Sequence, residues 1–206
     1  MATSVTKICN MALGKLGSTR INDIDDSTED SPQIILCRLH YEQTRDALIR
    51  SHFWRFASGR ATLSQDTTDP DFEWDNQFIL PTDFLRLKSL FSDNGTTTEN
   101  TRFSYAIEGD RLLTDEGSVD LRYIKKITDT SKFDPLFVEV LILQLALKFV
   151  GPLGGGDPKL QQIVQTELGV VMRKVRALDR QETNTVGRNN LQPWVDRAAS
   201  FRQDRV

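Results

Sequence analysis

Five carboxylates crowd into eight consecutive positions near the start of the chain and are the first candidates for chemistry. They are Asp23, Asp25, Asp26, Glu29 and Asp30. Carboxylate oxygens are ligands that Ca²⁺ prefers, so a calcium-binding loop is one interpretation. The EF-hand pattern has Gly at its sixth position and Glu at its twelfth, but counting from Asp23 these positions hold Thr28 and Ile34. The spacing therefore favours a solvated acidic loop.

The other reactive residues form no recognised motif. Cys37 and His40 are three apart and could make a zinc site with Cys9 or His52, but zinc sites usually show paired close spacings. Buried reduced thiols are the favoured interpretation. The glycines at 154–156 precede Asp-Pro-Lys, whereas a phosphate-binding loop ends in Gly-Lys-Ser/Thr. We therefore expect no enzyme, no cofactor and no metal. A hydrolase stays open, because glycosidase carboxylates have no fixed spacing.

Composition indicates a soluble globular protein rather than a general nucleic-acid binder. The 206 residues are 38% hydrophobic and 27% charged, with a net charge of −3, whereas nucleic-acid binders are normally basic. Such a chain can form a core without disulfides. No basic segment followed by an apolar region marks the N-terminus as a signal peptide, so synthesis inside the cell is expected.

A strongly apolar helix at 134–153 is the element around which the others should pack. Asp134-Pro135 is a typical start and Gly151-Pro152 a typical stop. The run is shorter than the usual membrane span and includes Glu139 and Lys148, which favours a buried helix of a soluble protein over a membrane span.

Three more helices are expected, giving a bundle of about four. The first covers 4–16, the second runs from Ser31-Pro32 to about Arg50, and the fourth starts at Asp157-Pro158. Apolar positions of the second helix include Ile35, Leu39, Leu48 and Ile49, and its charged residues Glu42, Arg45, Asp46 and Arg50 suggest an exposed face. The fourth helix carries an apolar stripe of Leu160, Ile163, Val164, Leu168, Val171, Val175 and Leu178.

The segment between the second and third helices has the pattern of β structure. Short alternating runs from Phe78 to Ile127 are separated by Gly-containing turns, which predicts an antiparallel meander of four or five strands. The fold class is thus α+β. The expected division is a helical bundle at 1–52 and 128–182, an inserted β region at 53–127, and an extended C-terminal arm at 183–206.

Together these segments resemble the tail tubular protein A-like adaptors, or head-to-tail connector proteins, of short-tailed bacteriophages. The likeness covers about residues 5–182. It rests on segments in a matching order: Ala12-Leu13-Gly14, the acidic loop, Tyr41-Glu42-Gln43-Thr44-Arg45-Asp46, Trp54, Phe56-Ala57, Arg60-Ala61-Thr62-Leu63, Leu80-Pro81-Thr82-Asp83-Phe84-Leu85-Arg86, Tyr105-Ala106-Ile107-Glu108-Gly109, Leu113-Thr114-Asp115, Leu121-Arg122-Tyr123-Ile124 and Phe133-Asp134-Pro135-Leu136-Phe137.

The resemblance implies a structural virion protein at the head-tail junction, made in the host cytoplasm. Members form a non-enzymatic ring, typically twelvefold, between the portal protein and the tail nozzle protein, with tail fibres as a further candidate partner. DNA passes through without specific binding, and no membrane is involved. The family supplies no catalytic residues to transfer. The rival interpretations are a virion-associated cell-wall hydrolase and a small monomeric or dimeric assembly factor.

Two sets of residues are expected to serve such a ring. The arm should be disordered alone and dock on the portal through residues of the types enriched at interfaces: Arg188, Leu191, Trp194, Arg197, Phe201 and Arg202. The channel should be lined by carboxylates, for which Asp23, Asp25, Asp26, Glu29 and Asp30 are the candidates, because Lys and Arg would bind the passing phosphates. The isolated protein is expected to be largely monomeric.

Overall fold

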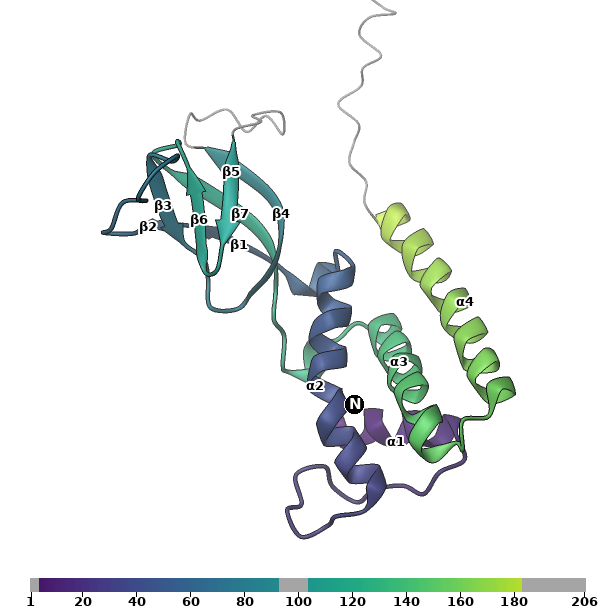
Figure 1. Ribbon diagram of the computed structural model, residues 1–206. Helices are drawn as coiled ribbons and strands as arrows, with labels where there is room; N and C mark the ends of the chain where they lie inside the picture. Colours follow the sequence, from purple (N-terminus) through teal and green to yellow (C-terminus); the bar gives the residue numbers. More distant parts are fainter. Residues whose placement is uncertain (1–3, 93–103, 183–206) are drawn as a thin grey trace, which may run out of the picture.

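The computed structural model, which describes residues 4–92 and 104–182, combines helices with antiparallel sheets (Figure 1). The helices of this part are α1 (Val5–Lys15), α2 (Pro32–Ser51), α3 (Pro135–Leu153) and α4 (Pro158–Glu182). Its strands are β1 (Ser58–Thr62), β2 (Ser64–Gln65), β3 (Asn76–Ile79), β4 (Phe84–Ser92), β5 (Tyr105–Glu108), β6 (Arg111–Thr114) and β7 (Val119–Lys125). The expected α+β fold, with strands inserted between the second and third helices, is confirmed.

Helix starts follow the capping residues in the sequence. The Ser4 hydroxyl accepts from the Lys7 N–H at 3.2 Å, and the Asp134 carboxylate accepts from the Leu136 N–H at 2.8 Å. Ser31 precedes α2 but makes no side-chain capping bond. The bonds to the Ser4 and Asp134 side chains satisfy backbone N–H groups that have no other partner within the first helical turn.

Helix α3 lies within the expected range 134–153, but Gly151-Pro152 is part of its last turn and does not end it. The helix continues to Leu153, with Pro152 inside its last turn. Proline removes only its own N–H, and the Gly154 N–H still donates to the Val150 carbonyl at 2.9 Å, so the last turn closes. Gly155 and Gly156 then adopt positive φ angles of 62° and 70°, which turn the chain back into α4.

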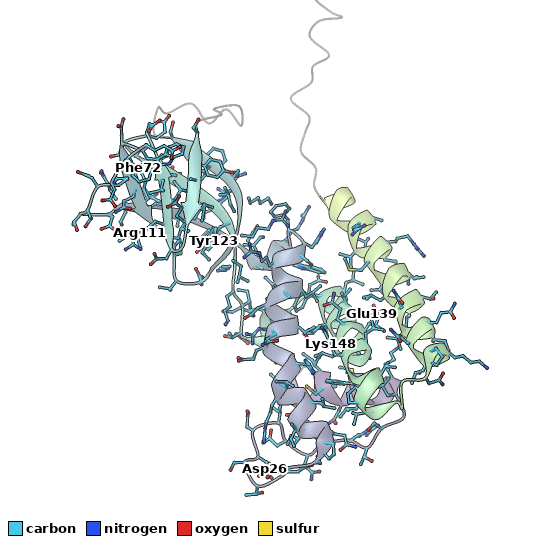
Figure 2. The ribbon with its side chains drawn as sticks, viewed as in Figure 1. Asp26, Phe72, Arg111, Tyr123, Glu139 and Lys148 are labelled. Carbon is cyan, nitrogen blue, oxygen red and sulfur yellow. The ribbon has the colours of Figure 1, made fainter. Side chains whose placement is uncertain are left out.

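Helix α3 is the centre of the helical part, and α1, α2 and α4 all contact it. Phe137, Leu141, Leu145 and Phe149 are completely buried along it. Its Glu139 and Lys148 are exposed (Figure 2). By length and composition α3 is also the one helix of the described segments that could cross a membrane, and half of that window is buried against the rest of the protein.

The strands form two sheets rather than one meander. The first has the order β1-β7-β4 and the second β2-β3-β6-β5, and every pair is antiparallel. The strand order differs from the expected meander because β7 returns to lie between β1 and β4. Buried apolar side chains from both sheets, among them Phe78, Leu112 and Leu121, form a second core separate from that of the helices.

The insertion is fixed to one end of α2 by polar and aromatic contacts. The Arg86 guanidinium donates to the Arg50 and Ser51 carbonyls at 3.2 and 3.4 Å, where the C-terminus of a helix attracts positive charge. It also lies 4.3 Å from the centre of the Phe53 ring. The sheets therefore sit at the end of α2 that is remote from the acidic loop (Figure 1).

Candidate functional surfaces

The acidic loop between α1 and α2 is held in place through its backbone. The Asn10 side chain donates to the Ile21 carbonyl at 2.9 Å and accepts from the Ile21 N–H at 2.8 Å. The Arg38 Nε donates to the Ile24 carbonyl at 2.8 Å, and both isoleucines are buried. Apolar and polar anchors thus fix a loop whose carboxylates face outward, at the end of the helical part away from the sheets, where Figure 2 labels Asp26.

The five predicted carboxylates share this loop without converging on one point. Asp23, Asp25 and Asp30 are exposed, and Asp26 and Glu29 are partly exposed. Asp26 accepts from the Thr28 hydroxyl at 2.6 Å and from its N–H at 2.9 Å, and these bonds hold the pKa of Asp26 below its ordinary value. Within residues 4–92 and 104–182 no group of three or more His, Cys, Asp or Glu could hold a metal ion. The arrangement is a negatively charged surface.

The two cysteines meet in the core. Both are buried free thiols, Cys9 on α1 and Cys37 on α2. A hydrogen bond with Cys37, together with burial, raises the pKa of Cys9 far above its ordinary value, which keeps it protonated. His40 is partly exposed and packs near the Phe149 ring, with centroids 6.3 Å apart. The interpretation of these cysteines as buried reduced thiols agrees with this geometry.

An ionic cluster around the buried Arg45 joins α2 to the segment after β7, and sequence reasoning missed it. Arg45, expected on an exposed face, is only 3% exposed, and its Nε donates to the Asp46 carboxylate at 2.7 Å. Lys126 Nζ lies 3.0 Å from the same carboxylate. Burial raises the pKa of Asp46, but the hydrogen bonds from Arg45 and Lys126 outweigh it, so the net pKa is lowered. Burial raises the pKa of the neighbouring Tyr41 to about 12.

An open hollow beside this cluster brings together charges of both signs. Asp25, Arg38, Glu42 and Arg45 contribute to its lining, together with Thr128. Two carboxylates in one concavity are what a glycosidase requires, so Asp25 and Glu42 are the residues on which the hydrolase alternative can be tested.

Apolar side chains on the outer surfaces of α2 and α4 are a second departure from the sequence-based expectation. Ile35 and Leu39 are 50% and 59% exposed, while Ile163 and Leu178 are 62% and 44% exposed. The predicted apolar stripe of α4 is wrong at Ile163 and Leu178, because Val164, Val171 and Val175 form the buried side of the helix. The apolar doublets Ile34-Ile35 and Ile163-Val164 were the sequence signal of this exposure. Adjacent helical residues point about 100° apart, so one member of each doublet faces away from the core when the other is buried.

The six arm residues predicted to bind the portal all lie outside the described residues. They are Arg188, Leu191, Trp194, Arg197, Phe201 and Arg202. The described part ends at Glu182 on α4, from which the arm continues. Comparison of the chain with models of known protein families gave no match, and comparison with curated protein sequences gave none either.

Proposed function

We propose that this protein is the adaptor subunit of a twelvefold ring that joins the portal vertex of a phage capsid to the tail nozzle. The observation that carries the proposal is the order of the resembling segments over residues 5–182, together with the helical bundle and inserted antiparallel strands that the resemblance implies. Its work is contact with copies of itself, with the portal and with the nozzle. It performs no reaction and needs no cofactor.

The acidic loop suits the lining of a channel through which DNA slides. Adhesion of proteins to DNA comes mainly from Lys and Arg contacts to phosphates, and this loop presents carboxylates instead. The bonds from Thr28 to Asp26 favour its charged form. We assign Asp23, Asp25, Asp26, Glu29 and Asp30 to the lumen of the ring on this ground.

Charge reversal in the loop tests the lumen assignment. Asp23→Lys and Asp25→Lys together should slow genome release from assembled particles, and added salt should partly restore the rate because it screens phosphate contacts. The matched control is Asp69→Lys with Asp71→Lys, two exposed positions on the insertion with the same charge change. Equal release rates for both double variants, in particles of normal composition, would contradict the lumen assignment.

Assembly with the portal tests the adaptor function itself. Light scattering should report a small species for the protein alone and a ring-sized complex once portal protein is added. A chain truncated after Glu182 should keep its helical circular dichroism but bind the portal more weakly. A mass that does not respond to portal protein would favour the monomeric assembly factor. Cell-wall degradation that Glu42→Gln or Asp25→Asn abolishes would establish the hydrolase.

A further inference from the structure

Two exposed apolar pairs lie on opposite flanks of the helical part. The α2 face consists of Ile35 and Leu39, which are one helical turn apart. The α4 face consists of Ile163 and Val170, which are two turns apart and 62% and 39% exposed. Helix α3 contacts both α2 and α4 and runs between them (Figure 1). One subunit therefore presents different exposed apolar faces on two helices that flank α3.

We infer that the α2 face of one copy packs against the α4 face of the next copy. The inference rests on the proposed ring, which it deepens by naming the two surfaces that meet. Unlike faces on opposite flanks make a head-to-tail contact, and repetition of such a contact closes into a ring when the rotation fits. A contact between two identical faces would stop at a dimer.

Charges beside the two faces are complementary. Exposed Glu42 follows the α2 face by one turn, and exposed Asp30 precedes α2, at the edge where the acidic loop assigned to the lumen meets this contact. On α4, exposed Lys159 lies one turn before Ile163, and Lys174 lies one turn after Val170. Both patterns extend roughly 20 Å at 1.5 Å per residue. An acid-apolar-acid pattern thus faces a base-apolar-base pattern of similar length.

Between Asp30 and Glu42, and between Lys159 and Lys174, the Arg, Lys, Asp or Glu residue of the opposite sign is already engaged within the subunit. Arg38 on α2 donates to the backbone carbonyls of Ile24 and Asp26 in the acidic loop. Glu167 on α4 pairs with Lys15 of α1. The remaining charges favour contact between different flanks and disfavour contact between two α4 faces, which would bring lysines together. The partner that fits the α4 face is therefore the α2 face of a second copy.

Disulfide trapping tests the contact even when the free protein is mainly monomeric. Leu39→Cys and Ile163→Cys replace exposed side chains, and the natural cysteines are buried and do not compete. A mixture of the two variants should form the mixed disulfide at least tenfold faster than either variant forms its own dimer. The control is Phe72→Cys, which is 79% exposed on the insertion and should pair with Leu39→Cys only at the collision rate. A mixed rate no higher than this control would overturn the inference.

Charge exchange provides a second measurement on the same trapped pair. Glu42→Lys in the Leu39→Cys chain should slow trapping about tenfold, and Lys159→Glu in the Ile163→Cys chain should restore it, because both charges lie about one turn from the trapped positions. Restoration supports an antiparallel contact of α2 with α4, in which Glu42 meets Lys159, whereas two independent slowing effects contradict it. Unchanged circular dichroism and thermal unfolding of each variant exclude misfolding, since all four positions are exposed.

The contact and the adaptor function can fail separately. Selective trapping of a protein that never binds portal would leave the contact standing and remove the adaptor function. Rings at the head-tail junction that assemble normally with Leu39→Glu or Ile163→Glu subunits would leave the adaptor function standing and overturn the contact.

Discussion

Replacing Asp46 by Asn should destabilise the fold by about 2–3 kcal/mol. The change leaves the Arg45 guanidinium, 3% exposed, without its anionic partner, and breaking a buried ion pair costs about 3–5 kcal/mol. The Asp46 side chain is 23% exposed, so water compensates part of this loss and the smaller figure applies. At about 2–4 °C per kcal/mol for a chain of this size, the melting temperature should fall by about 4–12 °C.

Urea unfolding followed by circular dichroism measures this loss, and Lys126→Met provides the control. Lys126 is 42% exposed in its pair with Asp46, so its removal should cost less than about 1 kcal/mol. A loss of less than about 0.5 kcal/mol for the Asp46 variant would refute the reasoning, because Arg45 would then not depend on this charge.

Acid should remove the difference between the wild type and the Asp46 variant. The pKa of Asp46 is lower in the folded state than in the unfolded chain, where it is about 3.9. Its contribution to stability is therefore fully present above that pH and is lost as the pH falls through the folded-state pKa. The two unfolding curves should approach each other below about pH 4, and a constant separation down to pH 2 would contradict the ion-pair account.

Two further substitutions have matched controls in the chain. In Gly59→Ala the new Cβ would lie 3.0 Å from the Tyr123 ring, which is buried and bonded to Asp83, so a loss of about 1–3 kcal/mol is expected. Gly117→Ala meets nothing within 4 Å and should be nearly neutral; equal urea midpoints would refute the steric argument. Asp134→Ala removes the cap of α3 and should cost about 1 kcal/mol, whereas Ser31→Ala removes no capping bond. The reverse order of stabilities would show that capping does not decide these helix starts.

The helices could be predicted from the sequence because their signals are local. Ser4 and Asp134 are capping residues within three positions of the N–H groups they bind, and the α3 apolar run is long and nearly continuous. Strand pairing is not local. Nothing in the alternation of β7 indicates that it lies between β1 and β4, since strands far apart in sequence pair through backbone groups common to all residues.

The side chains whose surroundings were misjudged are those that depend on other elements. Arg45 follows the spacing of an exposed charged face, yet the packing of α2 against its neighbours buries it beside Asp46. Ile35 and Ile163 satisfy an apolar pattern, yet no described element covers enough of them to bury them. The acidic loop was found because its composition alone marks it, whereas its anchoring through Asn10 needed the coordinates.

The antiparallel pairing of β1 with β7 has a consequence for how this chain can change. Ser58 and Ile124 are direct partners across the two strands, so the segment leaves the bundle and returns to it at neighbouring points. Ala57 and Ile124 belong to the helical core, while Leu63 and Leu112 belong to the other. The inserted sheets can therefore be lengthened, shortened or exchanged between Ser58 and Ile124, in evolution or by design, without a change in the path of any helix.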